Sequence, residues 1–140
     1  MNIAFICTHN ACRSQIAEAL AHYYHPIGMH FYSAGSQPQR QINQDAVRLM
    51  KELYGIDMEK TQYSKTIAEL PTIDVAISMG CGVTCPFIGR DFDEDWGLED
   101  PSGHDDETFK RIIASIDAHV QTLIQTYQKK NAKYNVIQLS

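Results

Sequence analysis

The chain has 140 residues, of which 44% are apolar and 21% charged, values typical of a globular fold that argue against a disordered or fibrous protein. This length indicates a single domain, residues 1–140, with a core large enough to be stable without disulfide bonds or a structural metal. Twelve basic and seventeen acidic side chains give a formal net charge of −5, which argues against non-specific nucleic-acid binding.

The first residues contain no cationic segment followed by an apolar signal stretch, and no window approaches the ~20 apolar residues of a membrane span. We therefore expect a cytoplasmic protein without a membrane partner. In a reducing compartment Cys7, Cys12, Cys81 and Cys85 remain thiols, so we interpret them as catalytic, redox or metal-binding residues before disulfide bridges.

The first half of the chain alternates between two kinds of apolar pattern. Apolar runs at residues 2–6 and 31–34 predict two strands. Apolar residues at helical spacing predict helices from about residue 14 to 24 and over residues 46–53, the second one ending near Gly55.

The second half is predicted in the same way. Ser64 is expected to cap a short helix that ends before Pro71, and the apolar run 73–79 predicts a strand buried on both faces. Residues 80–105 form a long segment rich in glycine, proline and acids, which is typical of a functional loop. A continuous apolar stripe from Glu107 to Tyr127 predicts a long helix, followed by a tail that is either a frayed end or an edge strand.

Strands that alternate with helices predict an α/β fold, a single parallel sheet with helices on both faces. In such sheets ligands bind beyond the carboxyl ends of the strands. Cys7 and Gly80 each follow a predicted strand, so we expect them to face one pocket.

Residues 7–14, Cys-Thr-His-Asn-Ala-Cys-Arg-Ser, join the first strand to a helix N-terminus, where backbone amides and the helix dipole favour an anion. Arg13 adds a fork of donors for two oxygens, and the positive field favours the nucleophilic thiolate of Cys7. Ser14 is placed to hydrogen-bond the Cys7 sulfur, and Asn10 to hold the loop from inside. The expected oxyanion-binding residues are Thr8, His9, Asn10, Ala11, Cys12 and Arg13.

Two other interpretations of these cysteines remain open. One is an ordinary strand-to-helix turn with incidental cysteines. The other is a zinc module that uses Cys7 with Cys12 and Cys81 with Cys85, although structural zinc prefers C-x2-C to C-x4-C spacings. Because neither explains Arg13, we expect no metal; the histidines at 22, 25, 30, 104 and 119 are interpreted as surface residues.

Residues 7–14, together with Gln15 and Glu18, resemble the phosphate loop of low-molecular-weight protein tyrosine phosphatases and of the thioredoxin-coupled arsenate reductases that share their fold. The resemblance continues through residues 32–35, 78–81 and 96–101 and covers nearly the whole chain. His9 stands where the family often has glycine. Either this position needs no positive φ, or His9 tolerates strain and brings a cation to the oxyanion, or it is simply exposed at the rim.

The resemblance implies that Asp100 protonates the oxygen that leaves the substrate. Pro101 restricts Asp100 to an extended conformation and so directs its side chain. We expect the acids at positions 93, 94, 95 and 99 to raise the pKa of Asp100. The alternative is that residues 93–100 are a solvated acidic loop.

Cys81 and Cys85 separate two activities, because a phosphatase needs only Cys7, Arg13 and Asp100, whereas arsenate reduction needs electrons from thiols. The resemblance implies that Cys7 attacks arsenate, Cys81 then attacks Cys7, and Cys85 resolves that disulfide. The C-x3-C spacing is shorter than in the family, and two inert cysteines are the bland alternative.

We therefore expect a thiol-dependent arsenate reductase, with a phosphatase that hydrolyses phosphate monoesters as the alternative. The expected partners are an arsenate or phosphate oxyanion and an external thiol reductant, thioredoxin or a similar dithiol. No tightly bound cofactor is expected, and the protein is expected to be a monomer.

Two further expectations come from the resemblance. Cys12 is either a small buried residue beneath the loop or the partner of Cys7 in a protective disulfide. In some related reductases potassium lies beneath the loop, held by residues that match Asn10, Glu18 and Ser33. Here Lys65 lies near the position of a further acidic ligand, so its ammonium can replace the ion and we expect no strong potassium dependence.

Overall fold

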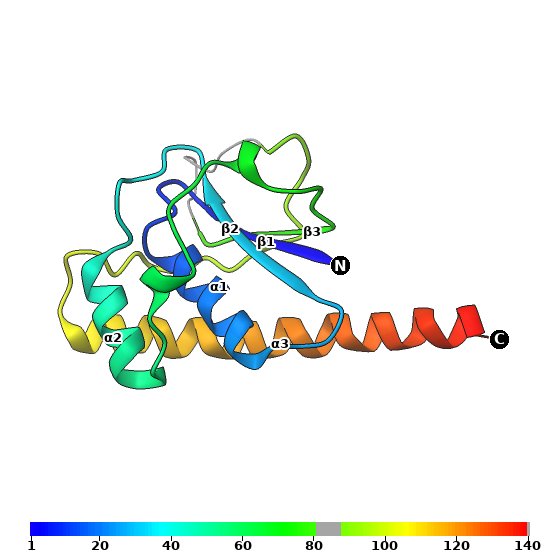
Figure 1. The fold of residues 1–140 in the computed structure, drawn as a ribbon. Helices are drawn as coiled ribbons and strands as arrows, with labels where there is room; N and C mark the ends of the chain where they lie inside the picture. Colours follow the sequence, from blue (N-terminus) through cyan, green and yellow to red (C-terminus); the bar gives the residue numbers. More distant parts are fainter. Residues whose placement is uncertain (81–87, 140) are drawn as a thin grey trace.

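The fold is built on a four-stranded parallel sheet with the order β2-β1-β3-β4, as the computed structural model shows (Figure 1). It describes residues 1–80 and 88–139, with side chains through Lys129. The strands are β1 (Asn2–Cys7), β2 (His30–Gly35), β3 (Val75–Ser78) and β4 (Glu94–Asp95). The apolar run of β1 lies between β2 and β3, which explains why Ile3 to Cys7 are all buried.

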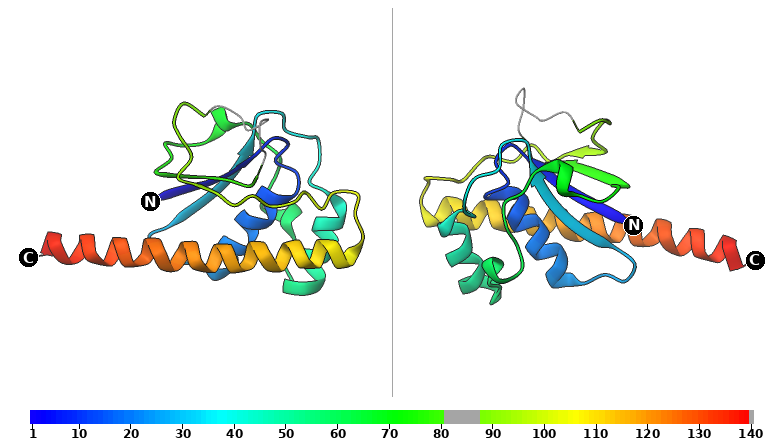
Figure 2. Two further views of the ribbon diagram at one scale, coloured as in Figure 1. Left: turned by 180° about the vertical axis from the view of Figure 1, so that it is seen from behind. Right: turned by 45° about the horizontal axis from the view of Figure 1, so that its top comes forward.

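Three α-helices, α1 (Arg13–Tyr24), α2 (Gln44–Tyr54) and α3 (Asp106–Leu139), pack on one face of the sheet (Figures 1 and 2). The other face is covered by the 3-10 helix η2 (Ile67–Glu69) and by loops, while the second 3-10 helix, η1 (Met58–Lys60), follows α2. The predicted α/β class with a parallel sheet is therefore confirmed. Helices were expected on both faces, but all three α-helices lie on one face, and the other carries the short 3-10 helix η2 and loops. None of the helices described is both long and apolar enough to cross a bilayer.

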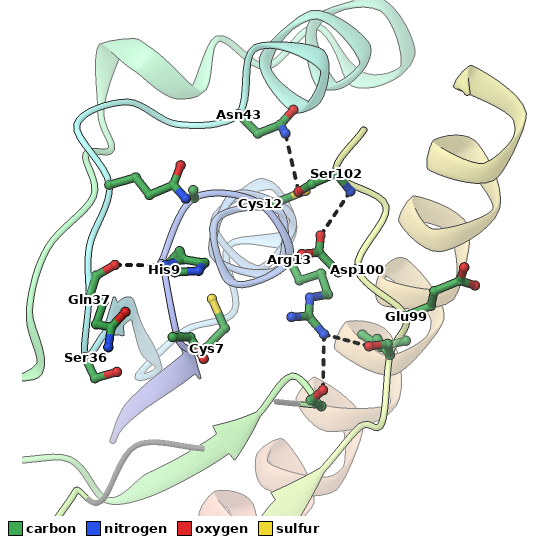
Figure 3. Close-up of a pocket in the computed structure, with 15 residues that line it drawn as sticks. Cys7, His9, Cys12, Arg13, Ser36, Gln37, Asn43, Glu99, Asp100 and Ser102 are labelled. Atoms are coloured by element: carbon green, nitrogen blue, oxygen red, sulfur yellow. Dashed lines mark hydrogen bonds between the residues drawn. The ribbon is translucent and has the colours of Figure 1, made fainter. Parts of the chain in front are cut away.

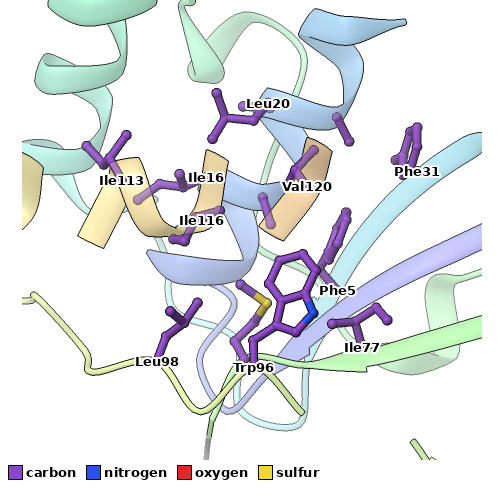
Figure 4. Packing of buried hydrophobic residues seen from close by; sticks show 14 of the residues in the cluster. Phe5, Ile16, Leu20, Phe31, Ile77, Trp96, Leu98, Ile113, Ile116 and Val120 are labelled. Carbon is purple, nitrogen blue, oxygen red and sulfur yellow. The ribbon is translucent and has the colours of Figure 1, made fainter. Parts of the chain in front are cut away.

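Successive side chains of β1 point to opposite faces of the sheet, so the buried residues form two clusters. Phe5 points toward the α-helices, where its ring lies 6.1 Å from Phe31 and 5.5 Å from Trp96 (Figure 4). Ile6 points to the opposite face and packs with residues of η2 and its flanking loops. The buried side of α1, which includes Ile16 and Leu20, packs in the same core cluster as Phe5. This packing holds the N-terminus of α1 next to the carboxyl end of β1.

The ends of α2 follow the expected local chemistry. Asn43 precedes the helix and its side chain accepts a hydrogen bond from the Ala46 amide at 3.0 Å. Gly55 ends it in the left-handed conformation, with φ of 69°. The cap at Asn43 also fixes where the chain between β2 and α2 passes beside the carboxyl edge of the sheet.

Several local predictions were wrong. Thr66, and not Ser64, caps the short helix η2, because its amide and hydroxyl both bond to the Glu69 carboxylate. The tail is neither an edge strand nor separate from the last helix, since α3 continues to Leu139 and extends past the sheet (Figure 2). The segment after Gly80 contains the strand β4, which the sequence analysis did not predict because β4 has only two residues, both acidic.

The β1–β2 register brings Gly35 beside Cys7, where β2 meets the segment that connects β1 to α1. That segment, residues 8–12, is here called the anion loop. A Cβ added at Gly35 would lie 2.5 Å from the Thr8 carbonyl oxygen and 2.7 Å from that of Cys7. Because both neighbours are backbone atoms, a side chain at Gly35 would force the anion loop away from the sheet.

We predict that Gly35→Ala lowers the free energy of unfolding by about 1–3 kcal/mol, the usual cost of overpacking, and also weakens phosphate binding. Urea unfolding and calorimetric titration with inorganic phosphate measure the two effects. The matched control is Gly55→Ala, where the left-handed backbone costs about 1–2 kcal/mol but nothing touches the anion loop. Equal phosphate affinity in both variants would contradict this account.

Candidate active site

All carbonyl groups of the anion loop are engaged by donors outside it. The carbonyls of residues 8–12 accept, at 2.7 to 3.1 Å, from the amides of Gln37, Gln39, Asn43 and Ile16 and from the Gln15 side chain. With every carbonyl bonded away from the centre, the loop's own amides are the groups left to converge on an anion. The chain between β2 and α2 supplies most of these donors, so it acts as the outer frame of the anion loop.

Asn10 holds the anion loop from beneath. It is fully buried and has a positive φ of 48°, a conformation that asparagine tolerates better than most residues. Its side-chain oxygen accepts from the Gln15 side chain and from the Lys65 amide, both at 2.9 Å. Its side-chain nitrogen donates to the Ser14 hydroxyl at 2.9 Å.

Cys7 lies at the base of the anion loop with its sulfur directed toward the pocket (Figure 3). The Asn10 amide donates to this sulfur at 3.2 Å, and the Ser14 hydroxyl lies 2.9 Å from it. Because Ser14 already accepts from Asn10, its hydrogen is free to point at the sulfur. The sulfur thus faces two hydrogen-bond donors at the N-terminus of α1, a position that suits a cysteine nucleophile.

Arg13, the first residue of α1, reaches across the pocket to the opposite wall (Figure 3). Its Nη1 donates to the Leu98 carbonyl at 2.6 Å and to the carbonyls of Met79 and Gly80 at 3.2 and 3.3 Å. One nitrogen thus anchors the guanidinium, and within residues 1–80 and 88–139 its remaining N–H groups have no hydrogen-bond partner, so they can reach oxygens of a bound anion.

Asp100 lines the same pocket, and the direction of its pKa corrects the sequence prediction. Partial burial raises the pKa, but hydrogen bonds from Ser102 and the positive charges of Arg13 and His9 outweigh it, so the pKa lies below its usual value. The neighbouring acids do not have the expected effect, since Glu99 pairs with Arg111 at 3.3 Å. In the free enzyme Asp100 is therefore a carboxylate.

Cys12 lies in the pocket wall as a neutral thiol. It is 5% exposed, and burial together with the nearby charge of Asp100 raises its pKa to about 12. The sulfur forms no disulfide in this structure. Its position agrees with the first of the two sequence interpretations, a small buried residue beside the anion loop.

His9 stands at the exposed rim, where its Nδ1 lies 3.1 Å from the Gln37 carbonyl oxygen (Figure 3). The carbonyl can only accept, so Nδ1 carries a hydrogen and the other ring nitrogen is left for solvent or ligand. The positive φ of the loop occurs at Asn10 and not at His9. The first sequence alternative therefore holds, and a side chain at position 9 brings no backbone strain.

These groups surround a cavity of about 750 Å³ at the carboxyl edge of the sheet. Thr8 and Ala11 complete the loop side, Ser36, Gln37 and Gln39 form one rim, and Leu98 to Ser102 form the other. No phenylalanine, tyrosine or tryptophan lines the cavity among the residues that the structure describes. The arrangement suits a small tetrahedral oxyanion held in front of a thiolate.

Comparison with known proteins agrees with this geometry. Residues 2–133 match the model of the low molecular weight phosphotyrosine protein phosphatase family. The chain belongs to this family. It is 35% identical over 127 residues to a glutaredoxin arsenate reductase of Synechocystis, a match that covers 87% of this chain and 95% of the relative.

Two further family members are similar over most of their length. Arsenate reductase 1 of Staphylococcus epidermidis is 34% identical over 129 residues, covering 86% of this chain and 92% of the relative. A solved arsenate reductase in the phosphate binding state superposes with a TM-score of 0.76 at 34% identity and covers 89% of this chain and 97% of its own.

Cys81 and Cys85, the predicted redox pair, lie outside the described residues. Gly80, which directly precedes Cys81, lines the cavity, and its carbonyl accepts from Arg13. A Cβ at Gly80 would lie 2.5 Å from the Leu98 amide nitrogen, so this glycine allows the end of β3 to approach the wall that carries Asp100. The zinc interpretation also needs Cys81 and Cys85; within residues 1–80 and 88–139 no metal-binding group is found.

Lys65 places an ammonium beneath the anion loop. Its Nζ lies 3.5 Å from the Glu18 carboxylate, and both side chains are nearly buried, at 10% and 6% exposed. Ser33 donates to the same carboxylate oxygen at 2.8 Å, and the Tyr63 carbonyl accepts from Nζ at 3.2 Å. The Lys65 ammonium thus pairs with Glu18, one of the residues that the resemblance assigns to a potassium site.

The sequence analysis missed several polar residues that line the pocket, among them Ser36, Gln37, Gln39, Asn43 and Ser102. Ser102 donates its amide to Asp100 at 3.0 Å, and Asn43 donates its side-chain nitrogen to the Ser102 hydroxyl at 3.4 Å. Asn43 could have been found as the cap of α2, because it stands three residues before the first apolar position of that helix. No signal in the sequence indicates that these two side chains meet.

We predict that wild-type turnover is the same in potassium and sodium salts at equal ionic strength, because Lys65 supplies the cation. Lys65→Ala leaves the buried Glu18 carboxylate with the Ser33 hydroxyl but without its ammonium partner, and should lower the free energy of unfolding by about 3–5 kcal/mol. Potassium should restore part of this stability. Urea unfolding in potassium and choline chloride measures this. Lys51→Ala, on the exposed side of α2, is the control; potassium-dependent wild-type turnover would contradict the assignment.

Cys12 should resist alkylation in the native protein. At pH 8 a pKa of about 12 instead of 9.0 lowers the thiolate fraction by roughly a thousandfold, and burial slows the reagent further. Iodoacetamide labelling followed by peptide mass spectrometry gives the rate at each cysteine. The same labelling in urea is the control, and equal rates at Cys12 in both conditions would refute the assignment.

Proposed function

We propose that this protein is a thiol-dependent arsenate reductase that works through a covalent adduct on Cys7. The observation that carries the proposal is the Cys7 sulfur at the base of the anion loop, with donors on the sulfur and the loop's carbonyls all turned outward. The names of the similar family members, which are arsenate reductases, support the choice of substrate.

The lining of the cavity favours an inorganic oxyanion over a phosphotyrosine side chain. An aryl phosphate would place its ring outside the anion loop, where stacking on an aromatic side chain stabilises such groups. The described rim offers amide and hydroxyl groups instead, from residues such as Ser36, Gln37 and Gln39. These polar groups match the oxygens of a free tetrahedral anion.

In the first step the Cys7 thiolate attacks the arsenic atom of bound arsenate while the amides of the anion loop and Arg13 hold its oxygens. A sulfur–arsenic bond forms, and a hydroxyl group of the arsenate leaves as water as its arsenic–oxygen bond breaks and it takes a proton from Asp100. The negative charge of arsenate beside Asp100 raises the pKa of this carboxyl, which is low in the free enzyme, and so lets it carry that proton.

In the second step the Cys81 thiolate attacks the Cys7 sulfur. A Cys7–Cys81 disulfide forms, the sulfur–arsenic bond breaks, and its electron pair stays on arsenic, which leaves as arsenite. Cys85 then attacks Cys81, which frees Cys7 as a thiolate and leaves a Cys81–Cys85 disulfide. An external dithiol such as thioredoxin reduces that bond; the name of the Synechocystis relative makes glutaredoxin the second reductant to test.

The alternative function is hydrolysis of phosphate monoesters through a phosphoenzyme on Cys7. It is favoured by the family itself and by Asp100, because the same nucleophile and acid suffice when water completes the reaction. Since the first step is shared, we expect weak phosphatase activity alongside arsenate reduction.

The test is arsenate-dependent NADPH consumption, measured with thioredoxin and its reductase and in parallel with glutaredoxin, glutathione and glutathione reductase. We expect turnover in at least one system. Mass spectrometry of arsenate-treated enzyme should show loss of two free thiols, and four free thiols after that treatment would exclude the reductase.

Two cysteine variants separate the reductase from the phosphatase. Cys81→Ser should abolish arsenate turnover but leave p-nitrophenyl phosphate hydrolysis, whereas Cys7→Ser should abolish both. The assays are the coupled NADPH assay and nitrophenol release. Equal loss of both activities in Cys81→Ser would overturn the division of labour, and a reductase that survives Cys7→Ser would overturn the nucleophile.

A further inference from the structure

Ser102 lies where three separate segments of the chain meet at the cavity (Figure 3). Its amide donates to Asp100 Oδ1 at 3.0 Å. Its hydroxyl accepts from Asn43, the residue that caps α2, at 3.4 Å and lies near enough to the Cys12 thiol of the anion loop to lower the pKa of that thiol. Ser102 therefore links the segment that carries Asp100 to the anion loop and to the start of α2.

We propose that Ser102 is a positioning residue, which holds the Asp100 carboxyl facing the anion loop and keeps the segment that carries it at a fixed distance from Cys7. This role rests on the proposed function, in which Asp100 supplies the proton for the departing oxygen. Ser102 does not act on the anion itself; it acts through Asp100.

The segment needs such a link because little else directs the Asp100 side chain. Pro101 is buried and fixes the backbone, while Asp100 and Ser102 are both exposed at the rim. Glu99, on the other side, turns away to Arg111. An exposed carboxylate without a hydrogen bond would sample several rotamers, and a general acid is effective only within hydrogen-bond reach of its target.

Ser102 also contributes to the charge state of Asp100. The titratable or charged groups near Asp100 are Arg13, His9, Cys12 and Glu99. The amide and the hydroxyl of Ser102 lower the pKa of Asp100 more than the charges of Arg13 and His9 do. Removal of the hydroxyl should therefore raise the pKa of Asp100 while the amide bond and the two cations remain.

The experiment is a carbon-13 NMR titration of the Asp100 carboxyl in wild type, Ser102→Ala and Ser102→Thr, with Asp100→Asn for assignment. We expect the pKa of Asp100 to rise by about half a unit in Ser102→Ala and to return in Ser102→Thr, which keeps the hydroxyl. An identical pKa in wild type and Ser102→Ala would overturn the proposal.

Kinetics give an independent readout. Ser102→Ala should lower kcat for arsenate roughly tenfold, because the acid is less often in place, while KM stays within about twofold. A rise in KM at constant kcat would mean that Ser102 binds the anion, which would also overturn the proposal. Ser115→Ala, on α3 and away from the cavity, is the control and should match wild type.

The two readouts distinguish failure of this proposal from failure of the proposed function. If the wild-type protein does not turn over arsenate, the reductase assignment fails, but the NMR comparison still decides whether Ser102 governs Asp100. If arsenate is turned over and Ser102→Ala changes neither the pKa nor kcat, the reductase stands and the positioning role of Ser102 is rejected.

Discussion

The structure of the site depends on one constraint, which is that the carbonyls of the anion loop must be bonded away from its centre. A loop of five residues at the carboxyl end of β1 would expose its carbonyls to the cavity unless donors outside it engaged them. Those donors come from α1 and from the chain between β2 and α2. The close approach at Gly35 and the cap at Asn43 both serve to keep this outer frame in register with the loop.

Cys7, Cys12 and Arg13 lie around one cavity but have different electrostatic surroundings. The Cys7 sulfur receives hydrogen bonds from the loop and lies at the N-terminus of α1, whereas Cys12, only five residues away, is buried beside Asp100 and keeps its proton. Arg13 is attached to the far wall through three carbonyls, so its charge stays at the cavity, where it also lowers the pKa of Asp100. One thiol is thereby prepared for reaction and the other is not.

Beneath the loop, the Lys65–Glu18 pair gives the site its own buried cation. A buried carboxylate needs a partner, and here the partner is covalently part of the chain. Its backbone amide also bonds to Asn10, so the residue that neutralises Glu18 also helps to fix the positive-φ residue of the loop. The stability of the fold and the shape of the site are thus coupled through one lysine.

The sequence by itself determined the parallel α/β class, the strand-loop-helix unit around Cys7 and the place of this cysteine at the helix N-terminus, because apolar periodicity and helix start signals are local properties of residues 2–24. Only the tertiary structure decided the charge state of Asp100, the cap of η2, the strand β4 and the meeting of Ser102 with Asn43 and Cys12. Each of these depends on groups far apart in the chain, such as Arg13 beside Asp100. Neither the number of acids nearby in the sequence nor the pattern of apolar residues predicts which distant residues become neighbours in the fold.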